Sequence, residues 1–88
     1  MSKLVNLSES SLIAMHSLAL IAKNSREPVS AKHIAEALGA SLNTVSKVMQ
    51  RLVKSGYVKS QRGPSGGFVL SKNPQDITLL DVYEAIEG

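Results

Sequence analysis

The amino-acid sequence predicts a mainly α-helical fold with one small β-hairpin, in the order helix, helix, helix, hairpin, helix. Two observations predict this order. Apolar residues recur at helical spacing before residue 56 and again after residue 78, whereas the stretch between them is strand-like around a glycine-rich loop. The chain has 88 residues, of which 43% are apolar, so we expect a single domain over 1–88 with a modest core.

The first predicted helix covers about residues 9–23. Ser8 is a good N-cap residue, and apolar residues follow it at helical spacing. These apolar residues are Leu12, Met15, Ala19 and Ala22. The pattern fades at Lys23 and Asn24, and Pro28 lies beyond, so the helix is expected to end there.

The second and third helices are predicted to flank a tight turn over residues 39–41. Ser30 and Ser41 are suitable N-cap residues, and Gly39 and Gly56 suit the left-handed position that ends a helix. The apolar residues of each helix follow the spacing of one inner face. They are Ala31, Ile34, Ala35 and Leu38 in the second helix, and Val45, Val48, Met49 and Leu52 in the third. Two helices joined in this way predict a helix-turn-helix.

A β-hairpin is predicted after Gly56. Residues 57–61 and 68–70 have strand-like composition, and the loop between them, which contains GPSGG, is longer than the tightest hairpin turns. A hairpin directly after a helix-turn-helix is the wing of a winged helix-turn-helix. The predicted fold class is therefore a three-helix core, a wing and a further C-terminal helix.

The last helix is predicted over residues 79–87. Thr78, with Asp81 three residues later, resembles a capping box that opens a helix. Ile77, just before it, is expected in a brief extended segment.

Charge is distributed unevenly along the chain. Residues 1–36 carry a net charge of +1, residues 37–75 carry +6 with no acidic residue, and residues 76–88 carry −4. An acid-free block of this kind is typical of a surface that binds a polyanion. It is equally typical of a solvated basic face, so charge alone leaves both interpretations open.

The outward face of the predicted third helix is polar and basic. At 100° per residue, Asn43, Lys47, Gln50, Arg51 and Lys54 fall opposite the apolar stripe. The second helix of a DNA-binding helix-turn-helix lies in the major groove, with its N-terminal polar residues toward base edges. Helix pairs with glycine turns also occur in other α-helical domains, so this feature alone does not decide the function.

The predicted wing adds a second possible contact with DNA. Arg62 stands where the loop begins, and its guanidinium group could clamp a phosphate or enter a narrow minor groove. Gly63, Gly66 and Gly67 would let the backbone approach a duplex closely. Alternatively, Arg62 is a solvated turn residue and the glycines serve only the turn; the acid-free block favours the DNA interpretation. The loop lacks the Gly-Lys-Ser/Thr ending of a nucleotide-binding P-loop.

Residues 52–70, LVKSGYVKSQRGPSGGFVL, followed by NPQDITLLDVYEAIEG, resemble the Rrf2 family of bacterial winged-helix transcription regulators. The resemblance extends to LIAMHSLALIA in the first helix and VSAKHIAEALGAS around the turn. It implies a homodimer that binds a partly palindromic operator and represses or activates nearby genes. By position, it also implies DNA contacts from the third helix and the wing. These residues are Ser41, Asn43, Thr44, Ser46, Lys47, Ser60 and Arg62.

The chain also departs from the family pattern. Family members often have Tyr-Leu at the positions of Thr44 and Val45, and an acidic or amide residue at Ser46, so an operator sequence cannot be transferred. The family usually continues past the position of Gly88 into a sensory loop, with three cysteines in its cluster-binding branch, and a long dimerisation helix. This sequence has no cysteine, so no iron–sulfur cluster is expected within it. It is either a DNA-binding fragment or a short form that dimerises differently.

We therefore expect sequence-specific binding of double-stranded DNA, with the third helix in the major groove and the wing on the minor groove or backbone. The predicted contact residues are Ser41, Asn43, Thr44, Ser46, Lys47, Arg51, Lys54, Lys59, Ser60, Arg62, Gly63 and Ser65. The alternative is a winged-helix protein-interaction module whose basic face binds an acidic partner.

The sequence offers little support for other functions. His16 and His33 have no second His or Cys at ligand spacing, and no Ser/His/Asp arrangement is indicated, so neither a metal site nor an enzyme is expected. The most apolar stretch, 12–22, is about half as long as a membrane span. The absence of cysteine fits a reducing bacterial cytoplasm, with the protein at the nucleoid. The last predicted helix carries three carboxylates, Asp81, Glu84 and Glu87. We interpret them as charges at the start of the helix and as a solvated face.

Overall fold

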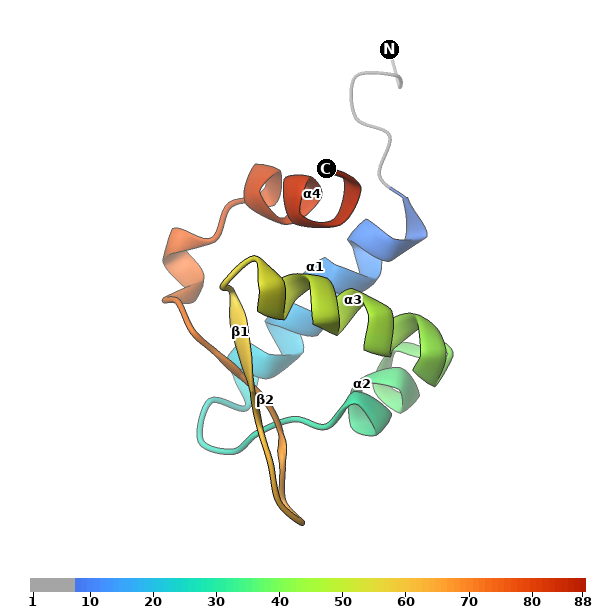
Figure 1. Ribbon diagram of the computed structural model, residues 1–88, viewed down its shortest axis with the longest axis vertical. Coiled ribbons are helices and arrows are strands. Elements are labelled where there is room, and N and C mark those ends of the chain that lie inside the picture. The colour runs from blue at the N-terminus through green and yellow to red at the C-terminus, as the bar shows by residue number, and fades with distance from the viewer. Residues whose placement is uncertain (1–7) are drawn as a thin grey trace.

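The computed structural model describes residues 8–88, and its elements follow the predicted order (Figure 1). They are α1 (Glu9–Lys23), α2 (Ala31–Leu38), α3 (Leu42–Lys54), β1 (Val58–Gln61), β2 (Gly67–Leu70), η2 (Pro74–Asp76) and α4 (Leu79–Glu87). The bounds of the four predicted α-helices are confirmed. The short 3₁₀ turn η2 was not predicted, whereas Ile77 after it is extended, as expected.

A hydroxyl side chain caps the start of every α-helix, because the first backbone N–H groups of a helix have no partner within it. The caps accept a hydrogen bond at 3.0–3.1 Å from the N–H three residues on, and they are Ser8, Ser30, Ser41 and Thr78. At Thr78 the predicted capping box is complete, because the Thr78 N–H donates to the Asp81 carboxylate at 2.9 Å. Gly39 ends α2 at φ +66°, the left-handed conformation that its position required.

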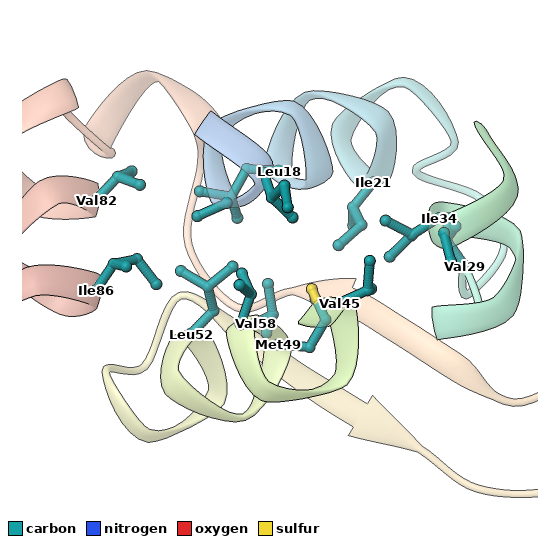
Figure 2. Close-up of a cluster of buried hydrophobic side chains, with 14 residues drawn as sticks. Leu18, Ile21, Val29, Ile34, Val45, Met49, Leu52, Val58, Val82 and Ile86 are labelled. Carbon is teal, nitrogen blue, oxygen red and sulfur yellow. The ribbon is translucent and has the colours of Figure 1, made fainter. Parts of the chain in front are cut away.

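The core lies between α1, α2, α3 and α4, whose apolar side chains point toward one another (Figure 2). The predicted inner stripe of α3 is buried, with Val45, Met49 and Leu52 fully inaccessible. Ile34 of α2 faces it, and this contact sets the angle between the two helices of the helix-turn-helix. None of the described helices combines the length and the apolar character that crossing a membrane requires.

The buried face of α1 is not the stripe that first stands out in its sequence. Leu12 is 43% exposed, and Ala19 is exposed as well. The side chains that face the core are Ser11, Ile13, Ala14, Ser17, Leu18 and Ile21. Because α1 is apolar on most of its circumference, its periodicity does not identify the inner face, and packing against α3 and α4 decides it.

The hairpin extends away from the helices, with its loop at the end of the molecule opposite α4 (Figure 1). Strands β1 and β2 are antiparallel, with register running from Val58 opposite Leu70 to Gln61 opposite Gly67. A single bridge residue, Val29, pairs with Phe68 through hydrogen bonds of 3.0 and 2.8 Å. This bridge ties β2 of the wing to the connection between α1 and α2, a contact that the sequence did not reveal.

Candidate nucleic-acid interface

The outer face of α3 presents polar side chains to solvent. Asn43, Lys47, Gln50 and Lys54 are exposed, while Thr44 and Ser46 are half-buried at its edges. This division follows from the sequence, since the buried stripe occupies the opposite side of the helix. The result is a polar helix face that protrudes from a rigid core, which is the geometry that major-groove reading needs.

The start of α3 is organised by Ser41. Its hydroxyl accepts the Thr44 N–H at 3.1 Å and donates to the Thr44 hydroxyl at 2.8 Å. The only proton of the Ser41 hydroxyl is therefore used inside the helix cap. The N–H groups of Leu42 and Asn43 have no partner within the helix, so this helix end can attract an anion through its backbone.

The wing carries exposed polar and basic groups along β1 and the loop. Lys59, Ser60 and Arg62 are exposed, as are Gly63 and Ser65 at the tip. The tip is closed by a hydrogen bond of 2.9 Å from the Gly66 N–H to the Gly63 carbonyl, and Gly63 adopts φ +112°. Few L-residues adopt that conformation, so glycine at position 63 is required by the turn whether or not the wing touches DNA.

The wing cannot shift freely relative to the helices. Gly67 lies so close to the α1–α2 connection that a Cβ added to it would be 2.5 Å from the Val29 carbonyl carbon and 2.8 Å from the Ser30 nitrogen. Only glycine allows the two backbones to approach in this way. The wing that carries Arg62 is therefore attached to the same helical core as α3.

Arg51 points to a different neighbour from the other predicted contact residues. Its Nη1 donates a hydrogen bond of 3.1 Å to the Ile86 carbonyl at the end of α4. With Lys47 and Lys54 it also borders a hollow of about 630 Å³ between α3 and α4, whose α4 side includes Glu84. Lys47 and Lys54 remain exposed at the border of this hollow, so the hydrogen bond to α4 is what distinguishes Arg51 from them, and the wing lies toward the opposite end of the molecule (Figure 1).

Ten of the twelve predicted contact residues are exposed, and Thr44 and Ser46 are half-buried. The structure brings the α3 residues onto one helix and the wing residues onto one hairpin, with Arg51 turned toward α4. Gln50 was not among the predicted contacts, yet it is exposed near the centre of the polar face. The 100° step had placed Gln50 on this polar face together with Asn43 and Lys47, and its exposure adds it to the candidate contacts.

The carboxylates of α4 have two structural roles that the prediction of a solvated face only partly covers. Hydrogen bonds from the backbone and side chain of Thr78 lower the pKa of Asp81. Glu87 is not simply solvated, as was predicted, because its carboxylate accepts hydrogen bonds from Ser8 and Ser11 at the start of α1. These bonds lower the pKa of Glu87.

These features define a winged helix-turn-helix domain with a basic reading face. A family model described as an iron-dependent transcriptional regulator, Rrf2, matches residues 7–88. The chain therefore belongs to the Rrf2 family of transcriptional regulators, and the resemblance seen in its sequence is confirmed.

Curated relatives and solved structures agree with this assignment. The chain is 40% identical over 85 residues to the transcriptional regulator NsrR of Bacillus licheniformis, covering 97% of this chain and 58% of that protein. It is 39% identical over 75 residues to the protein rrf2 of Nitratidesulfovibrio vulgaris, covering 85% of this chain and 45% of the relative. The chain spans about half the length of the curated relatives it matches.

Two solved structures have the same fold. CymR of B. subtilis, described as a global cysteine regulator, matches with a TM-score of 0.90 and 30% identity, over 96% of this chain and 66% of that one. IscR of T. potens matches with a TM-score of 0.87 and 31% identity, over 100% of this chain and 65% of that one. The predicted fold class, a winged helix-turn-helix, is thereby confirmed.

The family description refers to iron, which proteins bind through clusters of His, Cys, Asp and Glu side chains. Within residues 8–88, no group of three or more His, Cys, Asp or Glu side chains lies close enough together to hold a metal ion. The sequence also contains no cysteine. These residues therefore do not fit an iron centre.

Proposed function

We propose that this chain is the DNA-reading part of a transcription regulator, with α3 in the major groove of double-stranded DNA and the wing on the adjacent minor groove or backbone. The observation that carries the proposal is the exposed polar face of α3, held beside a basic wing within a block of six cations and no acid over residues 37–75. A duplex offers the matching surface, because its phosphates supply a dense negative charge and its groove admits a helix.

Base reading is assigned to the exposed polar face of α3. Asn43 and Gln50 carry amide groups, which pair bidentately with adenine, and Lys47 suits the acceptor edge of guanine. Thr44 and Ser46, at the edges of the polar face, have short hydroxyl side chains that could bond only to base edges lying close to the helix. Each good bidentate contact is worth about 1–3 kcal/mol of discrimination against a wrong base pair.

Phosphate contacts are assigned to the rim of the reading face. Lys54, Lys59 and Arg62 supply the charges, Ser60, Gly63 and Ser65 supply wing contacts, and Ser41 acts through the helix cap that it forms. The acidic residues of α4 would repel phosphates. We therefore orient the duplex toward the wing and away from α4.

The intact regulator is proposed to act as a homodimer on a partly palindromic operator in the bacterial cytoplasm. Two copies would place two α3 helices about one helical turn of DNA apart, which is how a two-fold protein matches a two-fold operator. The shared family of dimeric regulators supports this proposal. No cofactor is assigned to residues 8–88, and effector sensing is assigned to sequence outside them.

The test is fluorescence anisotropy with a duplex selected by this chain from a random 20-base-pair library, compared with a scrambled duplex. If Lys54, Lys59 and Arg62 each neutralise one phosphate, log K should fall with log salt at a slope of about −2.7 per chain. The affinity would then drop about 40-fold between 50 and 200 mM salt. Arg62→Ala should reduce the slope to about −1.8.

The control variant is Arg26→Ala, which removes an exposed arginine from the α1–α2 connection and should leave the slope unchanged. Equal binding of selected and scrambled duplexes would contradict sequence reading. Absence of binding to either duplex at low salt would reject the proposal and favour an acidic protein partner for the basic face.

A further inference from the structure

Three helices meet through polar side chains at the end of α4. The Arg51 guanidinium of α3 donates to the Ile86 carbonyl at 3.1 Å. On the next residue, the Glu87 carboxylate accepts the Ser11 hydroxyl of α1 at 2.8 Å and the Ser8 hydroxyl beside it. We call these five residues the α4 junction. Within it, Glu87 is 76 residues from Ser11 and 79 residues from Ser8 along the chain.

Burial makes the α4 junction more than a surface contact. Ser11 is only 1% exposed, so if Glu87 moved away its hydroxyl would lose its acceptor and keep only the longer bond, 3.3 Å, from the Ser8 hydroxyl. Ile86 beside it is 7% exposed and belongs to the core. Loss of either polar bond would therefore disturb packing as well as hydrogen bonding.

One hydrogen bond sets Arg51 apart from the other cations of α3. Lys47 and Lys54 border the same hollow as Glu84, but the Arg51 guanidinium group alone donates to the carbonyl end of α4 among the described residues. Arg51 also contributes to the lowered pKa of Glu87, after the larger effects of the two serine hydroxyls. A phosphate at this position would face carboxylates and the negative end of a helix dipole.

We infer that Arg51 is a positioning residue, which fixes the orientation of the reading helix α3 by binding the end of α4, itself fastened to α1 through Glu87 and Ser11. This inference rests on the proposed function, because α3 is taken to be the helix that reads DNA. Arg51 lies one turn beyond Lys47 on that helix, so a tilt of its C-terminal half would move the base-reading side chains. Small misplacements of this kind reduce specific contacts far more than general attraction to phosphates.

The experiment compares Arg51→Met with Lys54→Met in the full 88-residue chain. Both changes remove one positive charge from the C-terminal turn of α3 and keep a long apolar stem. Each variant is titrated against the selected and scrambled duplexes at four salt concentrations. For Arg51→Met we expect about tenfold weaker binding of the selected duplex, an unchanged salt slope and unchanged binding of the scrambled duplex. For Lys54→Met we expect weaker binding of both duplexes and a slope smaller by about 0.9.

A second variant tests the α4 junction without changing charge. Ser11 is buried and cannot touch DNA, so Ser11→Ala should reproduce the loss of specificity of Arg51→Met in a smaller form, about threefold, with an unchanged slope. Arg51→Lys keeps one donor for the Ile86 carbonyl and should restore most of the specific affinity. If Ser11→Ala does not fold, Glu87→Gln weakens the same contacts and takes its place; because it also removes a negative charge, its readout is the ratio of the affinities for the selected and scrambled duplexes.

Amide chemical shifts separate this inference from the proposed function. Without DNA, Arg51→Met should shift the amide signals of Ile86, Glu87 and Ser11, whereas Lys54→Met should leave them in place. Unshifted signals in Arg51→Met, or a reduced salt slope with equal loss for both duplexes, would overturn the positioning role. Failure of the wild-type chain to bind any duplex would reject the proposed function, while the chemical shifts would still decide the role of Arg51.

Discussion

The attachment of the wing depends on a glycine at position 67, and Gly67→Ala is the change that tests it. The new Cβ would lie 2.5 Å from the Val29 carbonyl carbon, against 3.4 Å for ordinary contact, so the two backbones must separate by about 0.9 Å. Gly67 does not have a positive φ, and so backbone conformation itself does not oppose alanine there. The clash alone decides the result.

The cost of Gly67→Ala follows from what that separation breaks. The Val29–Phe68 bridge holds two backbone hydrogen bonds, of 3.0 and 2.8 Å, and Val29 is only 5% exposed. Each bond contributes about 1 kcal/mol net, and partial exposure of Val29 adds to this, so we expect a loss of about 2–3 kcal/mol in the free energy of unfolding. For a domain of this size, the melting temperature should fall by roughly 10–20 °C.

The assay is urea and thermal unfolding followed by far-ultraviolet circular dichroism. Gly39→Ala is the matched control, because its Cβ meets nothing within 4 Å and it suffers only the left-handed conformation at φ +66°. That strain costs about 1 kcal/mol, so Gly39→Ala should be clearly less destabilised than Gly67→Ala. A Gly67→Ala variant within 0.5 kcal/mol of the wild type, or no worse than Gly39→Ala, would refute the reasoning.

Three further predictions concern single side chains. The Ser17 hydroxyl is buried without a hydrogen-bond partner among the described residues, so Ser17→Ala should leave the free energy of unfolding unchanged or raise it by up to about 1 kcal/mol in urea titrations. Folding lowers the pKa of Asp81 below its ordinary value of 3.8 because Thr78 donates hydrogen bonds to the carboxylate. The ionised Asp81 carboxylate therefore stabilises the fold above that pH, and this stabilisation is lost as pH falls through the folded pKa. In Asp81→Asn, the melting temperature should consequently fall less steeply than in the wild type as pH is lowered below about 5. Gln50→Ala should weaken binding of the selected duplex by about 1–3 kcal/mol with little change for the scrambled duplex, and equal loss for both would exclude base reading at that position.

Features set by neighbouring residues could be predicted from the sequence. The caps at Ser30, Ser41 and Thr78 act over three residues, and the left-handed Gly39 is required by the turn itself, so each is encoded locally. The inner stripe of α3 was equally clear, because its outer face is polar and contrasts with it. Most of the polar reading face follows directly from that contrast.

The inner face of α1 could not be predicted, because this helix lacks a clear contrast between an apolar and a polar side. Leu12 and Leu18 are both apolar, yet the first is 43% exposed and the second 8%. Which of them faces the core depends on where α3 and α4 pack, and no spacing within α1 contains that information. The sequence of a helix that is apolar on most sides predicts the helix but does not identify which side faces the core.

The same reasoning explains why the intramolecular bonds of Arg51 and Glu87 were not predicted. Both are charged residues on outward helix positions, and in sequence such residues are indistinguishable from a phosphate contact and a solvated carboxylate. Their partners, the Ile86 carbonyl and the Ser11 hydroxyl, are 35 and 76 residues away along the chain. Only the packing of α4 across α1 and α3 creates these contacts. In this domain one cation of α3 is bonded to α4, and the charge pattern of the sequence does not distinguish it from its exposed neighbours.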